Sequence, residues 1–152
     1  MRQFKNYEAA HNRKMWKMPE YFLDDKLFPI MIVEQDDTYM KSILEKDGCN
    51  VAFVEEHGYG NGYVGIPLWH PWSNKGYDEL NDIIEFDNGF TFSHLDPDKD
   101  FYWIGFDTNH YGMTKENWNK EKMLKTCRDI IEQAKQYTEF QRAVKLNKIK
   151  SL

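Results

Sequence analysis

Residues 114–137, TKENWNKEKMLKTCRDIIEQAKQY, carry the strongest secondary-structure pattern of the chain. Its apolar residues recur at the 3.6-residue spacing of an α-helix, and they are Trp118, Met123, Leu124, Cys127, Ile130, Ile131, Ala134 and Tyr137. Thr114 is a suitable N-cap, and Glu116 then lies in the first turn, where a carboxylate suits the helix dipole. The sequence therefore predicts a long amphipathic C-terminal helix that covers one face of a sheet.

Upstream of this helix, short apolar or alternating segments predict strands. They are Phe28–Gln35, Cys49–Glu55, Tyr63–Leu68, Phe90–His94 and Phe101–Phe106. The glycines of Gly58–Gly62 predict a wide hairpin loop with positive φ angles, which would join the second of these strands to the third. Five short strands at hairpin-like spacing indicate a mainly antiparallel sheet, so the predicted fold class is α+β.

Two further segments break the run of strands. Thr38–Lys46 predicts a short helix that Asp47-Gly48 ends, and Asp78–Phe86 fits either a helical turn or a short strand. Residues 1–27 mix aromatic and charged side chains without a clean period. A chain of 152 residues fits one domain, so we expect residues 1–152 to form a single domain.

Composition restricts the partners. The net charge of −5, from 25 acidic and 20 basic side chains, argues against a broad nucleic-acid surface. The basic tail of Arg142, Lys145, Lys148 and Lys150 fits a solvated helix end, with a nucleic-acid arm as the alternative. The longest apolar run, Phe28–Val33, is too short to span a bilayer, and the N-terminus has no secretory pattern. Cys49 and Cys127 lack metal-ligand spacing, so the sequence predicts a cytoplasmic protein with no membrane partner.

The segment Gly62–Pro71 is the first candidate for function. Its sequence, GYVGIPLWHP, runs from a strand into a proline-constrained loop that displays Trp69 and His70, with Trp72 just beyond. Indole rings beside an imidazole can stack on a nucleobase or another flat ligand. An aromatic loop packed over the sheet edge is the structural alternative.

The second candidate is Trp103–His110, WIGFDTNH, where a strand ends just before the long helix. Asp107 and His110 can hold one metal ion or one water, and His70 or His94 could complete a site of two histidines and one carboxylate. The alternative is a turn in which Asp107 satisfies backbone amides. The chain has no GxSxG, HExxH or Walker signature.

These two segments give the chain a resemblance to a family of small bacteriophage and prophage proteins. That family has G-Y-V-G-(I/V)-P-x-x-H-P, then H-G-G-x-T-(F/Y)-S, then W-(W/I/L)-G-F-D-x-x-H-x-G-D and a closing helix. Gly62–Pro71 matches the first element and Trp103–Gly112 the third, whereas Asp87–Ser93 has Asp-Asn in place of His-Gly, and Met113 replaces the last Asp. The resemblance implies a phage accessory protein in the host cytoplasm and brings no established activity.

Two classes of function follow as hypotheses. The first is a non-enzymatic, anti-defence binding protein that takes up a nucleotide-like small molecule or a host defence protein. Its expected ligand-binding residues are Tyr63, Trp69, His70, Trp72, Trp103, Asp107 and His110, and the abundance of aromatic residues is compatible with a homo-oligomer. The second is a metal-dependent hydrolase that uses His70, Asp107 and His110. The sequence identifies no general base for it, no catalytic residue and no cofactor.

Overall fold

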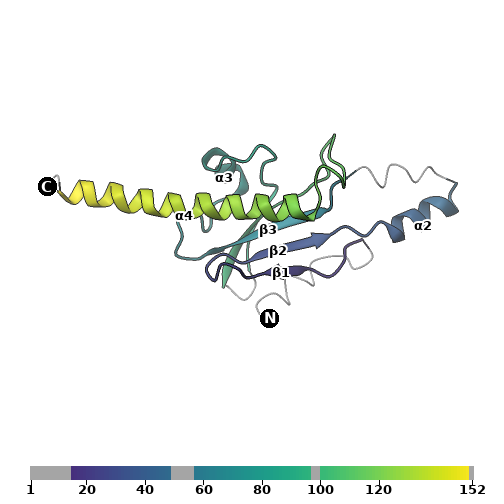
Figure 1. The fold of residues 1–152 in the computed structure, drawn as a ribbon, viewed down its shortest axis with the longest axis horizontal. Helices are drawn as coiled ribbons and strands as arrows, with labels where there is room; N and C mark the ends of the chain where they lie inside the picture. The colour runs from purple at the N-terminus through teal and green to yellow at the C-terminus, as the bar shows by residue number, and fades with distance from the viewer. Residues whose placement is uncertain (1–14, 49–56, 97–99, 151–152) are drawn as a thin grey trace.

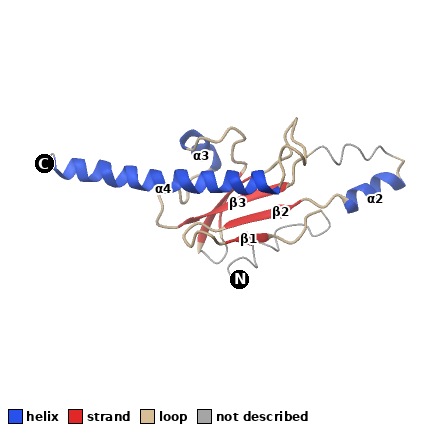
Figure 2. Cartoon of the chain, in the orientation of Figure 1, coloured by secondary structure: helices blue, strands red, loops and turns tan. Residues whose placement is uncertain are grey.

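Five antiparallel strands form one sheet in the order β1-β2-β3-β5-β4 (Figures 1 and 2). The structure is a computed structural model that describes residues 15–48, 57–96 and 100–150. The strands are β1 (Glu20–Phe22), β2 (Ile30–Glu34), β3 (Gly60–Pro67), β4 (Phe92–Leu95) and β5 (Phe101–Phe106). Four of the predicted strands correspond to β2, β3, β4 and β5, while the segment predicted at Cys49–Glu55 lies outside the described residues. The α+β class is confirmed.

Three helices accompany the sheet: α2 (Thr38–Lys46), α3 (Tyr77–Ile83) and α4 (Lys120–Lys150). The bounds of α2 match the prediction, and α3 resolves the ambiguous segment as a helix. The first half of α4 runs across the sheet, whereas its C-terminal half extends beyond the sheet edge (Figure 1). Of the described helices, none combines the length and apolar character that crossing a bilayer needs.

The long helix begins later than the sequence predicts. Thr114 starts a single isolated turn, in which the Thr114 carbonyl accepts the Trp118 amide at 2.8 Å and Thr114 and Asn117 exchange side-chain hydrogen bonds. The N-cap of α4 is Asn119, whose side-chain oxygen accepts the Lys122 amide at 2.9 Å. Thr114 is therefore a cap, but of the preceding turn. This turn places Trp118 just before the N-terminus of α4.

The central strand β3 corrects the predicted hairpin. It pairs with β2 on one side and with β5 on the other, so both of its edges are occupied. Gly60 and Gly62 lie within the strand rather than in a loop, and the glycines with positive φ in the described chain are Gly48, Gly89 and Gly112. A Cβ on Gly60 would lie 1.9 Å from the Val33 carbonyl oxygen. These glycines permit close approach between segments and do not form a turn.

The two faces of the sheet carry separate cores. The face under α4 contributes Ile30, Ile32, Val64, Ile66, Tyr102, Ile104 and Phe106, which pack against Met123, Cys127, Ile130, Ile131 and Ala134 of the helix. The opposite face buries Met31, Val33, Tyr63 and Trp103. Strand residues alternate between these faces, as the pleat requires. Cys127 is a buried free thiol, and burial raises its pKa.

Candidate functional site

The loop after β3 places His70 and Trp72 inside the protein rather than on a ligand-binding surface. His70 is 2% exposed and Trp72 is 1% exposed. The His70 ring meets the rings of Phe28 and Trp72 at centroid distances of 5.9 and 5.0 Å. Trp69 is 59% exposed and is the member of the predicted trio that reaches solvent. The alternative of an aromatic loop packed on the sheet describes this segment better than an open stacking site.

Both ring nitrogens of His70 are engaged by the backbone. The Nε2 atom lies 2.8 Å from the Ala134 carbonyl oxygen of α4, and the Trp72 amide donates to Nδ1 at 3.0 Å. A carbonyl can only accept and an amide can only donate, so the ring is the neutral tautomer with its proton on Nε2. Burial lowers the pKa of His70, which agrees with this form. His70 therefore joins the loop to α4.

Tyr63 and Trp103 lie on the opposite face of the sheet from His70 and Trp72. Both are buried, and the Trp103 indole donates to a carboxylate oxygen of Asp96 at 3.3 Å. Burial raises the pKa of Tyr63 to about 12, so its hydroxyl keeps its proton at neutral pH. The sheet itself thus separates the residues that the sequence assigned to one site.

Asp107 and His110 do come together, as the sequence predicts. His110 Nε2 lies 3.3 Å from Asp107 Oδ1, and both side chains are partly exposed. The same carboxylate also accepts the Asn109 amide at 3.0 Å and the Thr91 hydroxyl at 3.1 Å. Asp107 and Tyr63 help to line a small hollow of about 160 Å³ beside this pair. This volume is well below that of a typical small-molecule site.

The proposed ligand set for a metal is not assembled. Within residues 15–48, 57–96 and 100–150, no three histidine, cysteine, aspartate or glutamate side chains are grouped so that they could hold a metal ion. The Asp107–His110 pair supplies two candidate ligands, but His70 is buried under α4 with both nitrogens bonded to the backbone. The geometry therefore offers little support for the hydrolase hypothesis.

A polar cluster that no sequence pattern predicted joins three distant segments. His57 Nε2 lies 2.7 Å from Asp37 Oδ1, and Lys115 Nζ lies 2.8 Å from Asp37 Oδ2. The other His57 nitrogen faces the Gly58 carbonyl oxygen, and Asp37 and His57 are both buried. Asp37 thus links the end of β2 to the segment before β3 and to the loop before α4.

Asp37→Asn is expected to lower the free energy of unfolding by about 2 kcal/mol, because the amide offers one acceptor oxygen where the carboxylate offers two, so His57 or Lys115 loses its acceptor. Lys115→Gln should cost less than about 1 kcal/mol, since an exposed partner loses little. Urea denaturation of the two variants and the wild type measures both values. Equal losses would contradict the central role of the buried carboxylate.

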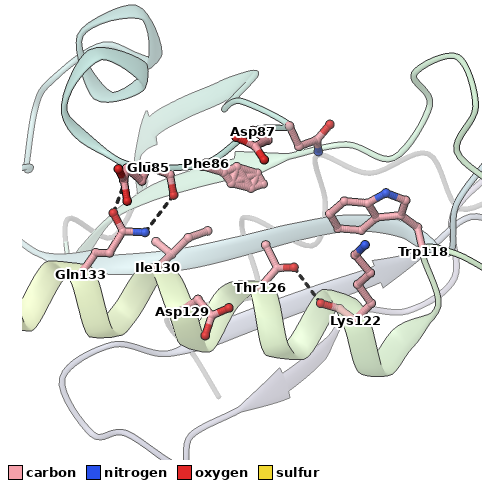
Figure 3. Close-up of a pocket in the computed structure, with 10 residues that line it drawn as sticks. Glu85, Phe86, Asp87, Trp118, Lys122, Thr126, Asp129, Ile130 and Gln133 are labelled. Atoms are coloured by element: carbon pink, nitrogen blue, oxygen red, sulfur yellow. Dashed lines mark hydrogen bonds between the residues drawn. The ribbon is translucent and has the colours of Figure 1, made fainter.

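A second and larger hollow lies between α4 and the chain that follows α3 (Figure 3). This groove has a volume of about 350 Å³, within the range of small-molecule sites. One wall is a strip of α4, formed by Lys122, Thr126, Asp129, Ile130 and Gln133, and the other is residues 85–88, with Trp118 at one end. At the other end the Gln133 amide and the Glu85 backbone exchange two hydrogen bonds of 2.9 Å.

Aromatic rings form the apolar part of the groove. The Phe86 ring lies 5.0 Å from Phe106 and 5.1 Å from Phe90, and the Trp118 ring lies 6.1 Å from Phe106. These contacts hold both lining rings, Phe86 and Trp118, against the core. A partial signal for this site is present in the sequence, since residues 122, 126, 129 and 133 recur on one helical face beside the apolar stripe. The sequence does not reveal which segment lies opposite them.

Comparison of the chain with protein-family models, with curated proteins and with solved structures found no match.

Proposed function

We propose that this chain is a non-enzymatic binding protein for a flat, nucleotide-like small molecule, and that the ligand occupies the groove between α4 and residues 85–88. The observation that carries the proposal is the pairing of two aromatic rings, Phe86 and Trp118, in a groove of about 350 Å³. Flat rings gain affinity by stacking on aromatic side chains. This location replaces the Trp69–Trp72 loop that the sequence suggested.

The phage or prophage origin, and with it an anti-defence role in the host cytoplasm, is proposed from the resemblance of Gly62–Pro71 and Trp103–Gly112 alone. For such a protein, binding a nucleotide-like signal would withdraw that signal from the host. A host defence protein is the other class of partner within this proposal, and it would not require the groove.

We expect a nucleobase-containing ligand to raise the melting temperature of the untagged protein. A ligand at about 100 times its Kd adds about 2.7 kcal/mol of stability, which corresponds to about 5–10 °C for a chain of this size. The panel should contain nucleobases, nucleosides, mononucleotides and cyclic dinucleotides, measured by thermal shift and then by calorimetry.

Trp118→Leu should weaken the best ligand about 10- to 100-fold, the value of one stacked ring. Thr126→Phe, which fills the groove from α4 and keeps both walls, should weaken it as well. Tyr111→Leu is the control, because Tyr111 is fully exposed and lies outside the groove. The absence of binding by every compound, or an equal affinity in all three variants, would overturn the proposal.

A further inference from the structure

The charges around the groove indicate which end of a nucleotide-like ligand it can hold. Glu85, Asp87 and Asp129 line it with carboxylates, whereas Lys122 is the lysine among its lining residues. Asp129 is paired with Lys125 of the same helix at 3.1 Å, and Lys125 is not among the lining residues. With three carboxylates and one ammonium group, the lining of the groove is net negative. The ligand has to supply hydrogen-bond partners for the other polar groups of the lining.

The hydrogen-bonding groups of the groove are mostly acceptors. One N–H of the Asn88 side-chain amide donates to the Asp107 carbonyl at 2.9 Å, and the Asn88 side-chain oxygen is an acceptor. The Thr126 hydroxyl donates to the Lys122 carbonyl at 2.7 Å, so its lone pairs are also acceptors. A ligand that satisfies these groups must itself carry N–H or O–H donors.

The lysine of the groove shows how a positive charge fits there. Lys122 Nζ lies over the Trp118 ring at 4.6 Å from its centroid, a cation–π contact (Figure 3). The Trp118 face is thus suited to a positively polarised group. An amino-substituted or protonated heterocycle can take the same position when the flexible Lys122 side chain moves aside.

We infer that the groove selects planar heterocyclic amines, such as amino-substituted nucleobases and their nucleosides, over phosphorylated nucleotides. This inference rests on the proposed function of the groove. The ring stacks on Phe86 or Trp118, and its N–H groups donate to Asp87 and to the acceptors of the α4 wall. A phosphate at the same place would meet the carboxylates, and one ammonium does not offset them.

Calorimetry with adenine, cytosine, adenosine and cytidine, beside the 5′-monophosphates of the two nucleosides, tests the inference. We expect each monophosphate to bind at least about tenfold more weakly than its nucleoside, because like charges repel across a partly buried groove. Monophosphates that bind as tightly as nucleosides, or more tightly, would overturn the charge argument while leaving the groove as the binding site. The absence of binding by all six compounds would overturn this inference, and it would overturn the proposed function as well only if every compound of the wider panel also failed to bind.

Two charge variants separate the recognition of donors from that of anions. Asp87→Asn should weaken the best nucleoside or base about tenfold, because a charge-assisted acceptor is lost. Lys122→Gln should tighten the binding of that ligand, since it removes a cation that competes for the Trp118 face. Asp82→Asn, on α3 and outside the groove, is the matched control. A large loss in Lys122→Gln together with no loss in Asp87→Asn would identify an anion site instead.

Discussion

Gly60→Ala is expected to lower the free energy of unfolding by about 3 kcal/mol, at the upper end of overpacking effects. Gly60 pairs with Glu34 where β3 begins and β2 ends, and an added Cβ would lie 1.9 Å from the Val33 carbonyl oxygen. The obstacle is the backbone of a buried strand, which cannot turn away as a side chain can. The Gly60 amide and carbonyl also bond to the Thr108 hydroxyl, so a shift of β3 disturbs those bonds too. Urea denaturation measures the loss.

Gly76→Ala is the matched control for this substitution. Gly76 has a φ of −65° and would have no atom within 4 Å of an added Cβ. Its replacement should change the free energy of unfolding by less than about 0.5 kcal/mol. If the two variants were equally stable, the contact between β2 and β3 at Gly60 would be looser than the structure has it.

The glycines have two different structural roles, which the sequence alone does not distinguish. Gly48 and Gly89 lie at positive φ, at the end of α2 and in the turn that the Gly89 amide and the Phe86 carbonyl close. Gly60 and Gly62 instead serve close packing inside β3. A glycine needed for its backbone angle and one needed for its lack of a side chain cannot be distinguished from the residue type alone.

Periodicity predicted the parts of the fold in which one strong pattern dominates. The apolar runs at β2 and β5 and the helical stripe of α4 all lie in the core, as expected. Strand β1 has three residues, too few for alternation to be visible. The start of α4 was wrong by one turn, because Thr114 and Asn119 are both good caps and the sequence does not decide which turn continues.

The candidate site was harder to predict, because aromatic character does not indicate the direction of a side chain. Trp103 and Trp72 are both fully buried, yet they belong to cores on opposite faces of the sheet. The pair Asp107 and His110 was predicted because three residues of separation suffice to bring it together. The groove depends on a long-range contact between residues 85–88 and α4, and no local sequence pattern predicts such a contact.

His70→Ala is expected to lower the free energy of unfolding by about 3 kcal/mol. The substitution leaves the Ala134 carbonyl and the Trp72 amide without their buried partner and opens a cavity beside Phe28. His110→Ala is the control of the same residue type, because His110 is largely exposed and should change stability by less than about 0.5 kcal/mol. If both variants lost the same small amount, His70 would not be the link between the loop and α4. Thermal and urea denaturation distinguish these results.

The same residue makes stability depend on pH in a defined direction. Burial lowers the pKa of His70 below its ordinary value of 6.5, so the folded protein keeps a neutral ring where the unfolded chain binds a proton. Its contribution is complete above about pH 6.5 and is lost as the pH falls from there toward the folded pKa, with a slope of up to about 1.4 kcal/mol per pH unit. His70→Gln keeps a donor for the Ala134 carbonyl and does not titrate, so its stability should fall less between pH 7 and pH 5. If stability fell in parallel with pH in the two proteins, His70 would bind a proton as readily in the folded state as in the unfolded chain. The two backbone hydrogen bonds of the neutral ring argue against that result.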